Sequence, residues 1–233
     1  MNENPKLVSV VMSTYNSEST IRDSIDSILK QTYKTFEFLI VDDCSSDNTY
    51  KIIKEYELKD NRLHVYRNEQ NIGLTKSLNK LIEYSKGEYI ARQDDDDISH
   101  LNRFEKQIKI MEKYNLDFCS SRAERLSNKK KIPGISYYLP KKISIKYKNP
   151  FIHGTLFIKK TVLEEIGGYD NNFYYSQDYK LMSLLLKKGY KFKFIKEVLY
   201  KLNTKNNISE SKKSEQNYYA ECVRKNIKPE YIK

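Results

Sequence analysis

Apolar residues along positions 7–91 follow two alternating spacings, and these spacings predict the first half of the fold. Four short runs are rich in β-branched and aliphatic residues, which is typical of strands buried on both faces. The runs are Leu7–Ser13, Phe36–Val41, Leu63–Tyr66 and Tyr89–Ala91. Between the runs, apolar residues recur every three or four positions, as at Ile21, Ile25 and Ile28, which predicts helices. Repeated alternation of strand and helix favours an α/β fold with a mostly parallel, doubly wound sheet.

The second half of the chain has a less regular pattern. Helical spacing returns at Arg103–Tyr114 and at Ser176–Lys188. Short strands are expected at Asp117–Ser121, Phe151–Ile158 and Phe192–Leu202. Residues 126–150 are rich in lysine and contain prolines, so we expect a long loop there. The last thirty or so residues are polar and basic without a clear apolar period, which predicts a tail.

Polar residues cluster where three of the predicted strands end. The sequence Thr14-Tyr15-Asn16 follows the first strand, Asp42-Asp43 the second, and four consecutive aspartates, Asp94 to Asp97, the fourth. Ligands of such sheets bind beyond the carboxyl ends of the strands, so these residues are expected to converge on one site. Adjacent carboxylates repel one another unless water or a cation screens them, and Mg²⁺ or Mn²⁺ prefers such oxygen ligands. A solvated acidic loop is the alternative, but it gives no reason for this convergence.

Composition excludes several classes of protein. No run reaches the roughly 18 to 20 apolar residues that a membrane-spanning helix needs, and the first residues lack an apolar signal segment. We therefore expect a cytoplasmic protein. Three cysteines and three histidines are too scattered to predict a zinc site or a disulfide framework, which agrees with a reducing compartment.

The net charge of +11 predicts an affinity for anionic partners. Twenty tyrosines could stack on bases, but the lysines are spread along the chain and no nucleic-acid-binding module is visible, so we expect no nucleic-acid partner. The lysine-rich segment Lys129–Lys148 has two interpretations, a solvated loop or a surface that meets an anionic acceptor or membrane headgroups.

Several short motifs, in order and at matching spacing, resemble the family-2 glycosyltransferases of the GT-A fold, from about Val8 to Ser209. The motifs are Val10–Asn16, Val41–Asp47, Asn71–Gly73, Tyr89–Asp97, Gly167–Asp170 and Gln177–Asp178. The resemblance implies a Rossmann-like nucleotide-binding half (residues 1–97) and a smaller half of the same domain that binds the acceptor and carries the catalytic base (98–205). A basic polar tail (206–233) would follow.

The resemblance also implies a donor site for a nucleotide-diphosphate sugar. Its residues are Ser13, Thr14, Tyr15, Asp43, Asn71, Gly73, Asp94 and Asp95. Tyr15 would pack against the base, Asp43 would accept a hydrogen bond from a base N–H, and the loop at Asn71 and Gly73 would close over the base. Asp94 and Asp95 would face the ribose and the sugar.

The aspartate run looks like the DXD motif, in which Asp96 would ligate Mn²⁺ or Mg²⁺ and Asp94 is a second candidate ligand. Arg92 either balances the charge of the run or has another role, and Asp97 is expected to cap the next helix. Many relatives carry Arg-x-His after the last strand, whereas this chain has Lys201 and Asn203 there. Lys201 could contact phosphate, and Asn203 would be a weaker metal ligand than histidine.

Inverting transfer requires a base that takes the proton of the acceptor hydroxyl. The resemblance assigns this role to Asp178, with a carboxylate that serves the helix dipole as the alternative. Gln177 departs from the acidic residue of relatives and would contact the acceptor as a neutral amide. His153 is either an acceptor-side contact or a structural residue of an apolar run.

The sequence thus favours a metal-dependent inverting glycosyltransferase that moves a hexosyl or N-acetylhexosaminyl group. The donor would be a nucleotide-diphosphate sugar, with a UDP-sugar favoured, and the acceptor a hydroxyl of a glycan or lipid-linked acceptor in surface polysaccharide synthesis. Peripheral contact with the inner face of the plasma membrane is a further expectation. The alternatives are a non-catalytic relative that binds nucleotide sugars or glycans and a sugar nucleotidyltransferase, although the first strand end lacks the glycine-rich loop of the latter.

Overall fold

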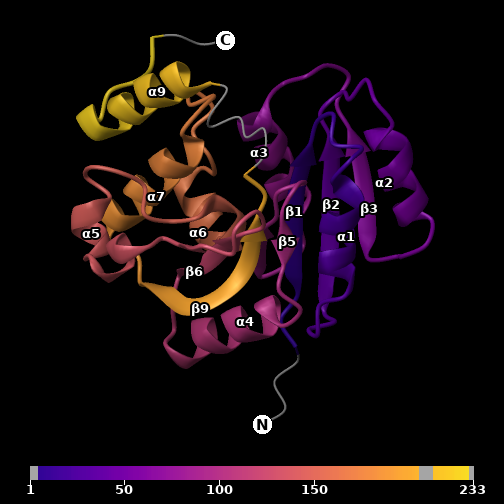
Figure 1. Ribbon diagram of the computed structural model, residues 1–233, viewed down its shortest axis with the longest axis horizontal. Helices are drawn as coiled ribbons and strands as arrows, with labels where there is room; N and C mark the ends of the chain where they lie inside the picture. Colours follow the sequence, from indigo (N-terminus) through magenta and orange to yellow (C-terminus); the bar gives the residue numbers. More distant parts are fainter. Residues whose placement is uncertain (1–4, 205–211, 231–233) are drawn as a thin grey trace.

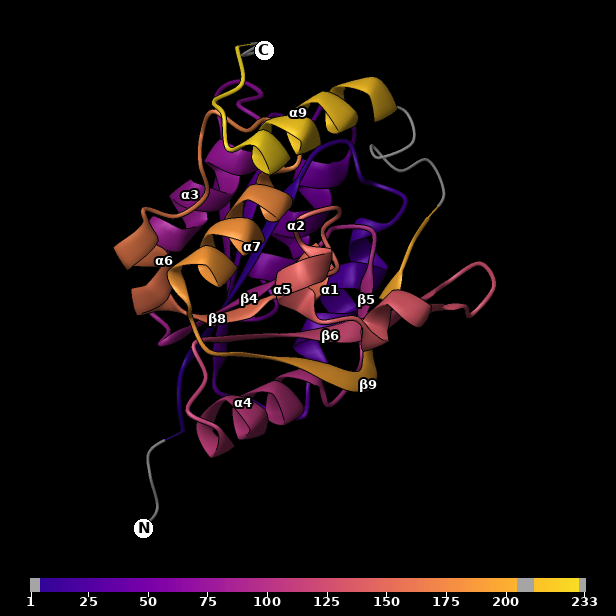
Figure 2. The ribbon, with the colours of Figure 1, turned by 90° about the vertical axis from the view of Figure 1, so that its left-hand side faces the viewer.

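The computed structural model describes residues 5–204 and 212–230. In this part of the chain the strands form one nine-stranded sheet with helices on both faces (Figures 1 and 2). The strand order is β3-β2-β1-β4-β8-β6-β9-β5, and β7 pairs with β6 at the side of this path. The site described below lies at the carboxyl ends of the first strands.

The four strands expected in the first half are present and parallel. They are β1 (Val8–Thr14), β2 (Phe36–Asp42), β3 (Leu63–Arg67) and β4 (Tyr89–Arg92). Strand β1 lies between β2 and β4, with Thr14 opposite Asp42 and Val11 opposite Arg92. Every residue of β1, β2 and β4 is buried, which explains the unbroken apolar runs in the sequence.

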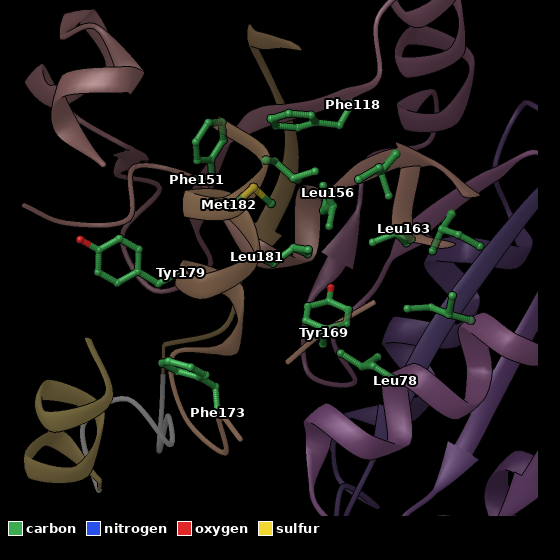
Figure 3. Close-up of a cluster of buried hydrophobic side chains, with 14 of the residues drawn as sticks. Leu78, Phe118, Phe151, Leu156, Leu163, Tyr169, Phe173, Tyr179, Leu181 and Met182 are labelled. Carbon is green, nitrogen blue, oxygen red and sulfur yellow. The ribbon is translucent and has the colours of Figure 1, made fainter. Parts of the chain in front are cut away.

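Side-chain alternation along β1 assigns each helix to one face of the sheet. Val8, Val10 and Met12 contribute to one apolar core and Val11 to the other. The first core includes residues of α1 (Ile21–Leu29), α2 (Thr49–Glu57) and α4 (Arg103–Lys113). The second includes residues of α3 (Leu74–Tyr84), α6 (Lys160–Ile166) and α7 (Gln177–Lys188). Figure 3 shows this second core, in which Leu78 of α3 and Met182 of α7 take part.

The second half extends the same sheet. Strand β8 (Phe157–Lys159) pairs antiparallel with β4 and so joins the two halves. The remaining strands are β5 (Ile98–Ser99), β6 (Phe118–Arg125), β7 (Lys131–Ile132) and β9 (Phe192–Leu202). Strands β6 and β9 run parallel, and β5 pairs antiparallel with β9. The sheet is therefore continuous from the first half of the chain into the second.

Two expectations for the second half are wrong in part. The segment Phe151–Ile158 was expected to be a strand, but η2, a 3-10 helix at His153–Thr155, precedes β8. Gly154 packs so closely on the Tyr200 ring that an added Cβ would lie 2.4 Å from its hydroxyl oxygen, which leaves no room for a regular strand with side chains here. The expected loop 126–150 also contains short elements, which are β7, η1 (Ile135–Tyr138) and α5 (Lys141–Ser144).

The expectation of a tail without apolar period is wrong for residues 213–225. They form α9 (Lys213–Lys225), which packs against α7 (Figure 1). Tyr219, Cys222 and Val223 are buried and belong to the second core. These three apolar positions, at helical spacing, form the face by which the helix packs on the core, and most of its remaining surface faces water. Residues 206–211 and 231–233 of the predicted tail lie outside the described residues.

Candidate active site

The polar strand ends that the sequence singles out meet at one edge of the sheet. Parallel pairing places the ends of β2, β1 and β4 side by side. The hydroxyl of Ser17, just after β1, donates to Asp95 Oδ2 at 2.5 Å, and the hydroxyl of Ser24 on α1 donates to the Asp94 carbonyl at 2.7 Å. The predicted convergence of the first strand end with the aspartate run is therefore confirmed.

Asp43, at the end of β2, organises the loop that leads into α3. Its carboxylate accepts hydrogen bonds from the backbone N–H groups of Ile72 at 2.9 Å and Gly73 at 2.8 Å, and from the Asn68 side chain at 2.8 Å. Asn71 is exposed at the tip of the same loop. Asp43 thus holds the backbone of the loop that contains Asn71 and Gly73, beside the end of β1.

An aromatic residue that the sequence did not single out lies against this loop. Gly73 has a φ angle of +85°, and a Cβ built on it would lie 2.6 Å from the Tyr174 ring. Tyr174 also lies close enough to Asp43 and Tyr15 for their charges to act on it, although burial is the main reason that its pKa is raised. Tyr15 is 49 % exposed. Two tyrosine rings therefore flank the place where Asp43 and Gly73 meet.

The aspartate run is paired with a buried arginine. Arg92, 1 % exposed, forms an ion pair with Asp94 at 2.5 Å between Nη2 and Oδ1. The interpretation that Arg92 balances the charge of the run is confirmed. One guanidinium cannot neutralise four carboxylates, so the site retains an excess of negative charge.

A buried polar network supports the loop from below. The Arg103 guanidinium donates to the Gln93 side chain, the Ser99 hydroxyl and the Arg92 carbonyl at 3.2, 2.9 and 2.9 Å. The backbone N–H of Asp94 donates to the Tyr200 hydroxyl at 3.0 Å. These contacts fix the backbone from which the acidic side chains project.

Asp97 does not cap the next helix. The residue before α4 is Asn102, whereas Asp97 is buried and accepts a hydrogen bond from the backbone N–H of Asn203 at 2.7 Å. Asp97 therefore ties the end of β9 to the aspartate loop. The error arises because the short strand β5 separates the run from the helix.

Crowding of carboxylates makes the loop suited to a cation. Burial, together with the charges of Asp94 and Asp95, raises the pKa of Asp96 to about 7. Burial also raises the pKa of Asp95, against the effect of the hydrogen bond from Ser17. Among residues 5–204 and 212–230, no three acidic, histidine or cysteine side chains gather as a complete metal cluster. The donor set therefore fits a divalent ion held by one or two carboxylates together with substrate phosphates.

Asp96 and Asn203 line the same pocket, which has a volume of about 470 Å³. Ser19, Thr20 and Asp23 complete its polar side. Lys201, two residues before Asn203, lies opposite Ile98 in the β5–β9 pair. The departures from the Arg-x-His pattern thus lie beside the aspartate loop, where a phosphate or cation contact would be made.

Asp178 lies in the first turn of α7. Its Oδ2 accepts a hydrogen bond from the side-chain NH₂ of Asn149 at 2.8 Å, and the side-chain Oδ1 of Asn149 in turn accepts from the Phe151 N–H at 3.0 Å. Gln177 is buried, at 8 % exposure. Asn149, which sequence reasoning missed, leaves Asp178 with a second oxygen for another partner.

His153 begins η2, four residues after Asn149, the partner of Asp178, and directly before Gly154, which packs on Tyr200. Its Nε2 is 2.8 Å from the Tyr169 hydroxyl. Burial lowers the pKa of His153 first, the Arg92 charge lowers it further, and the charges of Asp94 and Asp178 act in the opposite direction. The segment that contains His153 therefore connects the two groups of acids, since Gly154 packs on Tyr200, which binds the Asp94 N–H, and Asn149 donates to Asp178.

The fold and this constellation define a class of protein, the α/β nucleotide-sugar transferases. The profile of glycosyl transferase family 2 matches residues 9–167. The chain therefore belongs to glycosyl transferase family 2, a family of enzymes, and the resemblance seen in the sequence motifs is confirmed.

Two similar bacterial proteins illustrate the relationship. The chain is 37 % identical over 185 residues to the UDP-Glc:alpha-D-GlcNAc-diphosphoundecaprenol beta-1,3-glucosyltransferase WfgD of Escherichia coli, covering 78 % of this chain and 70 % of that protein. It is 35 % identical over 187 residues to the O-antigen biosynthesis glycosyltransferase WbnJ of E. coli, covering 77 % and 72 %.

Solved structures confirm the GT-A fold. TarS 1–349 of S. aureus in complex with UDP superimposes with a TM-score of 0.76 at 20 % identity, covering 93 % of this chain and 64 % of that one. The mannosyltransferase PcManGT of Pyrobaculum calidifontis, in complex with GDP-Man and Mn²⁺, gives 0.76 at 18 % identity, covering 98 % and 67 %. The chain thus spans less than two thirds of the TarS fragment. In residues 5–204 and 212–230, no helix has the length and apolar character to cross a membrane.

Proposed function

We propose that the chain is a metal-dependent inverting glycosyltransferase that moves a sugar from a nucleotide-diphosphate donor to a hydroxyl of a glycan or lipid-linked acceptor. The observation that carries this proposal is that the segment from Asn149 to Gly154 contacts the supports of both acidic groups. Gly154 packs on Tyr200, whose hydroxyl accepts a hydrogen bond from the Asp94 N–H of the crowded aspartate loop, and Asn149 donates to Asp178.

The donor would lie along the carboxyl ends of the first strands. Asp43 and Gly73 form one wall for the base, and Tyr15 offers a ring against which it can pack. Ser13 and Thr14, buried at the end of β1, border the nucleoside, while Asp94 and Asp95 are placed for the ribose and the sugar. Asp96, with Asp94 as a second ligand, would hold the cation, and Asn203 and Lys201 lie nearby. The bound cation supplies neutralisation of the charge that develops on the leaving diphosphate.

Asp178 would act as the general base. The acceptor oxygen forms a bond to the anomeric carbon from the face opposite the diphosphate, the bond from that carbon to the diphosphate oxygen breaks, and the hydroxyl proton passes to the Asp178 carboxylate. Asn149 holds one carboxylate oxygen, so the other is available for the proton. Gln177 and His153 are placed to contact the acceptor.

The names of similar proteins support a setting in surface glycan synthesis. WfgD carries diphosphoundecaprenol in its name and WbnJ acts in O-antigen biosynthesis. The name of WfgD, which is 37 % identical, includes UDP-Glc, and this supports a UDP-sugar as donor, while the more distant structures contain UDP, UDP-GlcNAc or GDP-Man. A lipid-linked acceptor would bring the protein to the membrane surface from the cytoplasmic side.

The substitution Asp178→Asn tests the proposal. It removes the proton acceptor while keeping the side-chain shape, so turnover with a UDP-sugar, Mn²⁺ and a diphosphate-lipid acceptor should fall about a thousandfold. Binding of UDP, measured by thermal shift, should persist. Glu215→Gln is the matched control, because Glu215 also lies in a first helical turn, that of α9. Undiminished turnover in Asp178→Asn would refute the role of this residue, and UDP binding without any turnover in the wild type would favour the non-catalytic alternative.

A further inference from the structure

Between Tyr138 and Lys148 the chain exposes an unusual concentration of large apolar and aromatic side chains. The exposed fractions are 73 % for Tyr138, 55 % for Leu139, 57 % for Ile143 and 74 % for Tyr147. Exposed lysines alternate with them. The 138–148 patch, as we name it, consists of Tyr138, Leu139, Lys142, Ile143, Lys146, Tyr147 and Lys148. Contiguous apolar exposure of this kind marks an interaction surface.

The inner side of this segment is firmly attached to the protein. Ile145 is buried in the second core, and the Lys141 ammonium group donates to the carbonyl oxygens of Tyr137 and Leu139. The same ammonium group lies over the Phe194 ring, 5.1 Å from its centroid. The exposed side chains of the patch are therefore presented by an anchored turn.

The charge of the surrounding sequence selects the partner. No Asp or Glu occurs between Glu124 and Glu164, a stretch that contains nine lysines. A surface that carries both cationic and apolar groups fits a partner whose outer layer is anionic and whose layer below is apolar. A soluble polyanion would attract the lysines but would give Leu139 and Ile143 nothing apolar to contact.

We propose that the 138–148 patch docks on a bilayer containing anionic phospholipid. Lys142, Lys146 and Lys148 would approach the headgroups, and the tyrosine rings would lie at the interface between headgroups and acyl chains. The apolar side chains Leu139 and Ile143 would enter the acyl boundary.

Two hydrogen bonds connect the patch to the first turn of α7. The Tyr179 hydroxyl donates to the Ile145 carbonyl at 2.6 Å, and Asn149 donates to Asp178 at 2.8 Å. In Figure 2, α5 and α7 lie beside each other on the face toward the viewer. Docking would therefore hold Asp178 close to the lipid surface, where a lipid-linked acceptor presents its hydroxyl. This consequence rests on the proposed function.

Vesicle sedimentation of the full chain tests the proposal. Wild-type protein should sediment with vesicles of phosphatidylcholine and phosphatidylglycerol and remain in solution with phosphatidylcholine alone. The variant Lys142→Gln/Ile143→Glu should lower the partition coefficient about tenfold or more, since each lysine near such a surface contributes about fivefold. The matched control Leu58→Glu/Lys59→Gln changes an exposed pair of the same kind elsewhere, with Leu58 86 % exposed, and should bind within about twofold of wild type.

Three results would overturn the proposal. The first is that wild-type protein does not sediment with anionic vesicles, and the second is that both double variants lose vesicle binding equally. The third is retention on heparin without vesicle binding, which would identify a soluble polyanion as the partner. A charge-only variant, Lys142→Gln/Lys146→Gln, should weaken sedimentation without adding an acid to the surface. UDP binding by thermal shift is measured in parallel. If the wild-type protein did not bind UDP, the proposed donor site would be refuted, whereas the vesicle result would still decide the membrane proposal.

Discussion

Gly73 shows how one backbone position serves both folding and the donor site. Its N–H donates to Asp43, its φ of +85° lies in the left-handed region, and its Cα hydrogen faces the Tyr174 ring. Gly189 has nearly the same φ, +83°, but a Cβ there meets no atom within 4 Å. Their ψ angles differ, however: Gly189 has ψ 15°, in the αL region, whereas Gly73 has ψ 160°, which is essentially restricted to glycine. Gly73 therefore combines a more restricted backbone conformation with the contact to Tyr174.

We predict that Gly189→Ala lowers the free energy of unfolding by about 1 kcal/mol, the cost of placing alanine at positive φ. Gly73→Ala should lower it by about 1 to 3 kcal/mol more, because its backbone conformation is less accessible to alanine and the Tyr174 ring must move, and it should weaken UDP binding as well. Urea denaturation and UDP titration measure both effects. Equal losses of stability in the two variants would show that the Tyr174 contact is unimportant.

His153 is a half-buried titratable group whose surroundings favour its neutral form. Burial and the Arg92 charge lower its pKa, so the unfolded chain takes up a proton at a higher pH than the folded protein does. The contribution of this residue to stability is therefore complete above the unfolded pKa of about 6.5 and is lost as the pH falls toward the folded pKa.

We predict that His153 lowers the free energy of unfolding of the wild-type protein by up to about 1.4 kcal/mol per pH unit as the pH falls from 6.5 to 5. In His153→Gln the slope in that range should become smaller. His100→Gln, which changes an exposed ring, should keep the wild-type slope in chemical denaturation at a series of pH values. An unchanged slope in His153→Gln would contradict the neutral ring.

Helix α9 was not predicted from the sequence pattern, although it contributes buried side chains to the second core. Tyr219 is 1 % exposed and its ring lies 6.1 Å from Phe173 and 5.8 Å from Tyr175, centroid to centroid. The Ser176 hydroxyl, before α7, donates to the Gln216 carbonyl of α9 at 3.1 Å. The helix thus supports the turn that positions Asp178.

We predict that Tyr219→Ala lowers the free energy of unfolding by about 3 to 5 kcal/mol, the usual cost of removing a buried aromatic ring. The neighbouring Tyr218, 39 % exposed, provides the control, and Tyr218→Ala should cost about 1 kcal/mol or less. Denaturant unfolding of both variants gives the comparison, and similar losses would mean that α9 is not part of the cooperative core.

The elements of the first half could be predicted because each carries a local signal. Strands such as β1 are buried on both faces, so Val8, Val10 and Val11 are all apolar, and helices such as α1 keep one apolar stripe. The strand-end residues Asp43 and Asp94 followed from this pattern. Their convergence needed no long-range information, because parallel strands end at the same edge.

The supports of the site could not be predicted for the opposite reason. Tyr200 reaches the Asp94 amide from 106 positions away, and Asn149 reaches Asp178 from a segment expected to be a loop. Tyr174 contacts Gly73 across a similar separation, about a hundred residues. Each of these residue types is common in a lysine- and tyrosine-rich chain, so only the folded arrangement distinguishes them. Asp97 was misassigned because its partner, the Asn203 amide, also lies far along the chain.

At the scale of the whole molecule, charge couples the two ligands that the donor site is proposed to bind. The Asp94–Asp97 loop has excess negative charge, yet the described residues supply no complete metal cluster. A cation and a diphosphate should therefore each bind weakly alone and more tightly together, because each neutralises or completes the site of the other.

We predict that UDP at about 100 times its dissociation constant, with Mn²⁺, raises the melting temperature by about 5 to 10 °C. UDP alone and Mn²⁺ alone should raise it by much less. EDTA should abolish the joint effect, and Asp96→Asn should reduce it. Additive shifts in differential scanning calorimetry would show that the two ligands do not share a site.

The continuous sheet also limits how such enzymes can be divided or recombined. Strand β4 ends in the aspartate loop, yet its outer edge is covered by β8, and the loop itself is held by β9 through Tyr200 and Asn203. A fragment cut after residue 97 would keep the acidic side chains but would expose an unpaired edge strand and lose the hydroxyl and amide that shape the loop. A chimera of two relatives would therefore keep the proposed cation site only if β9 and the aspartate loop came from the same parent.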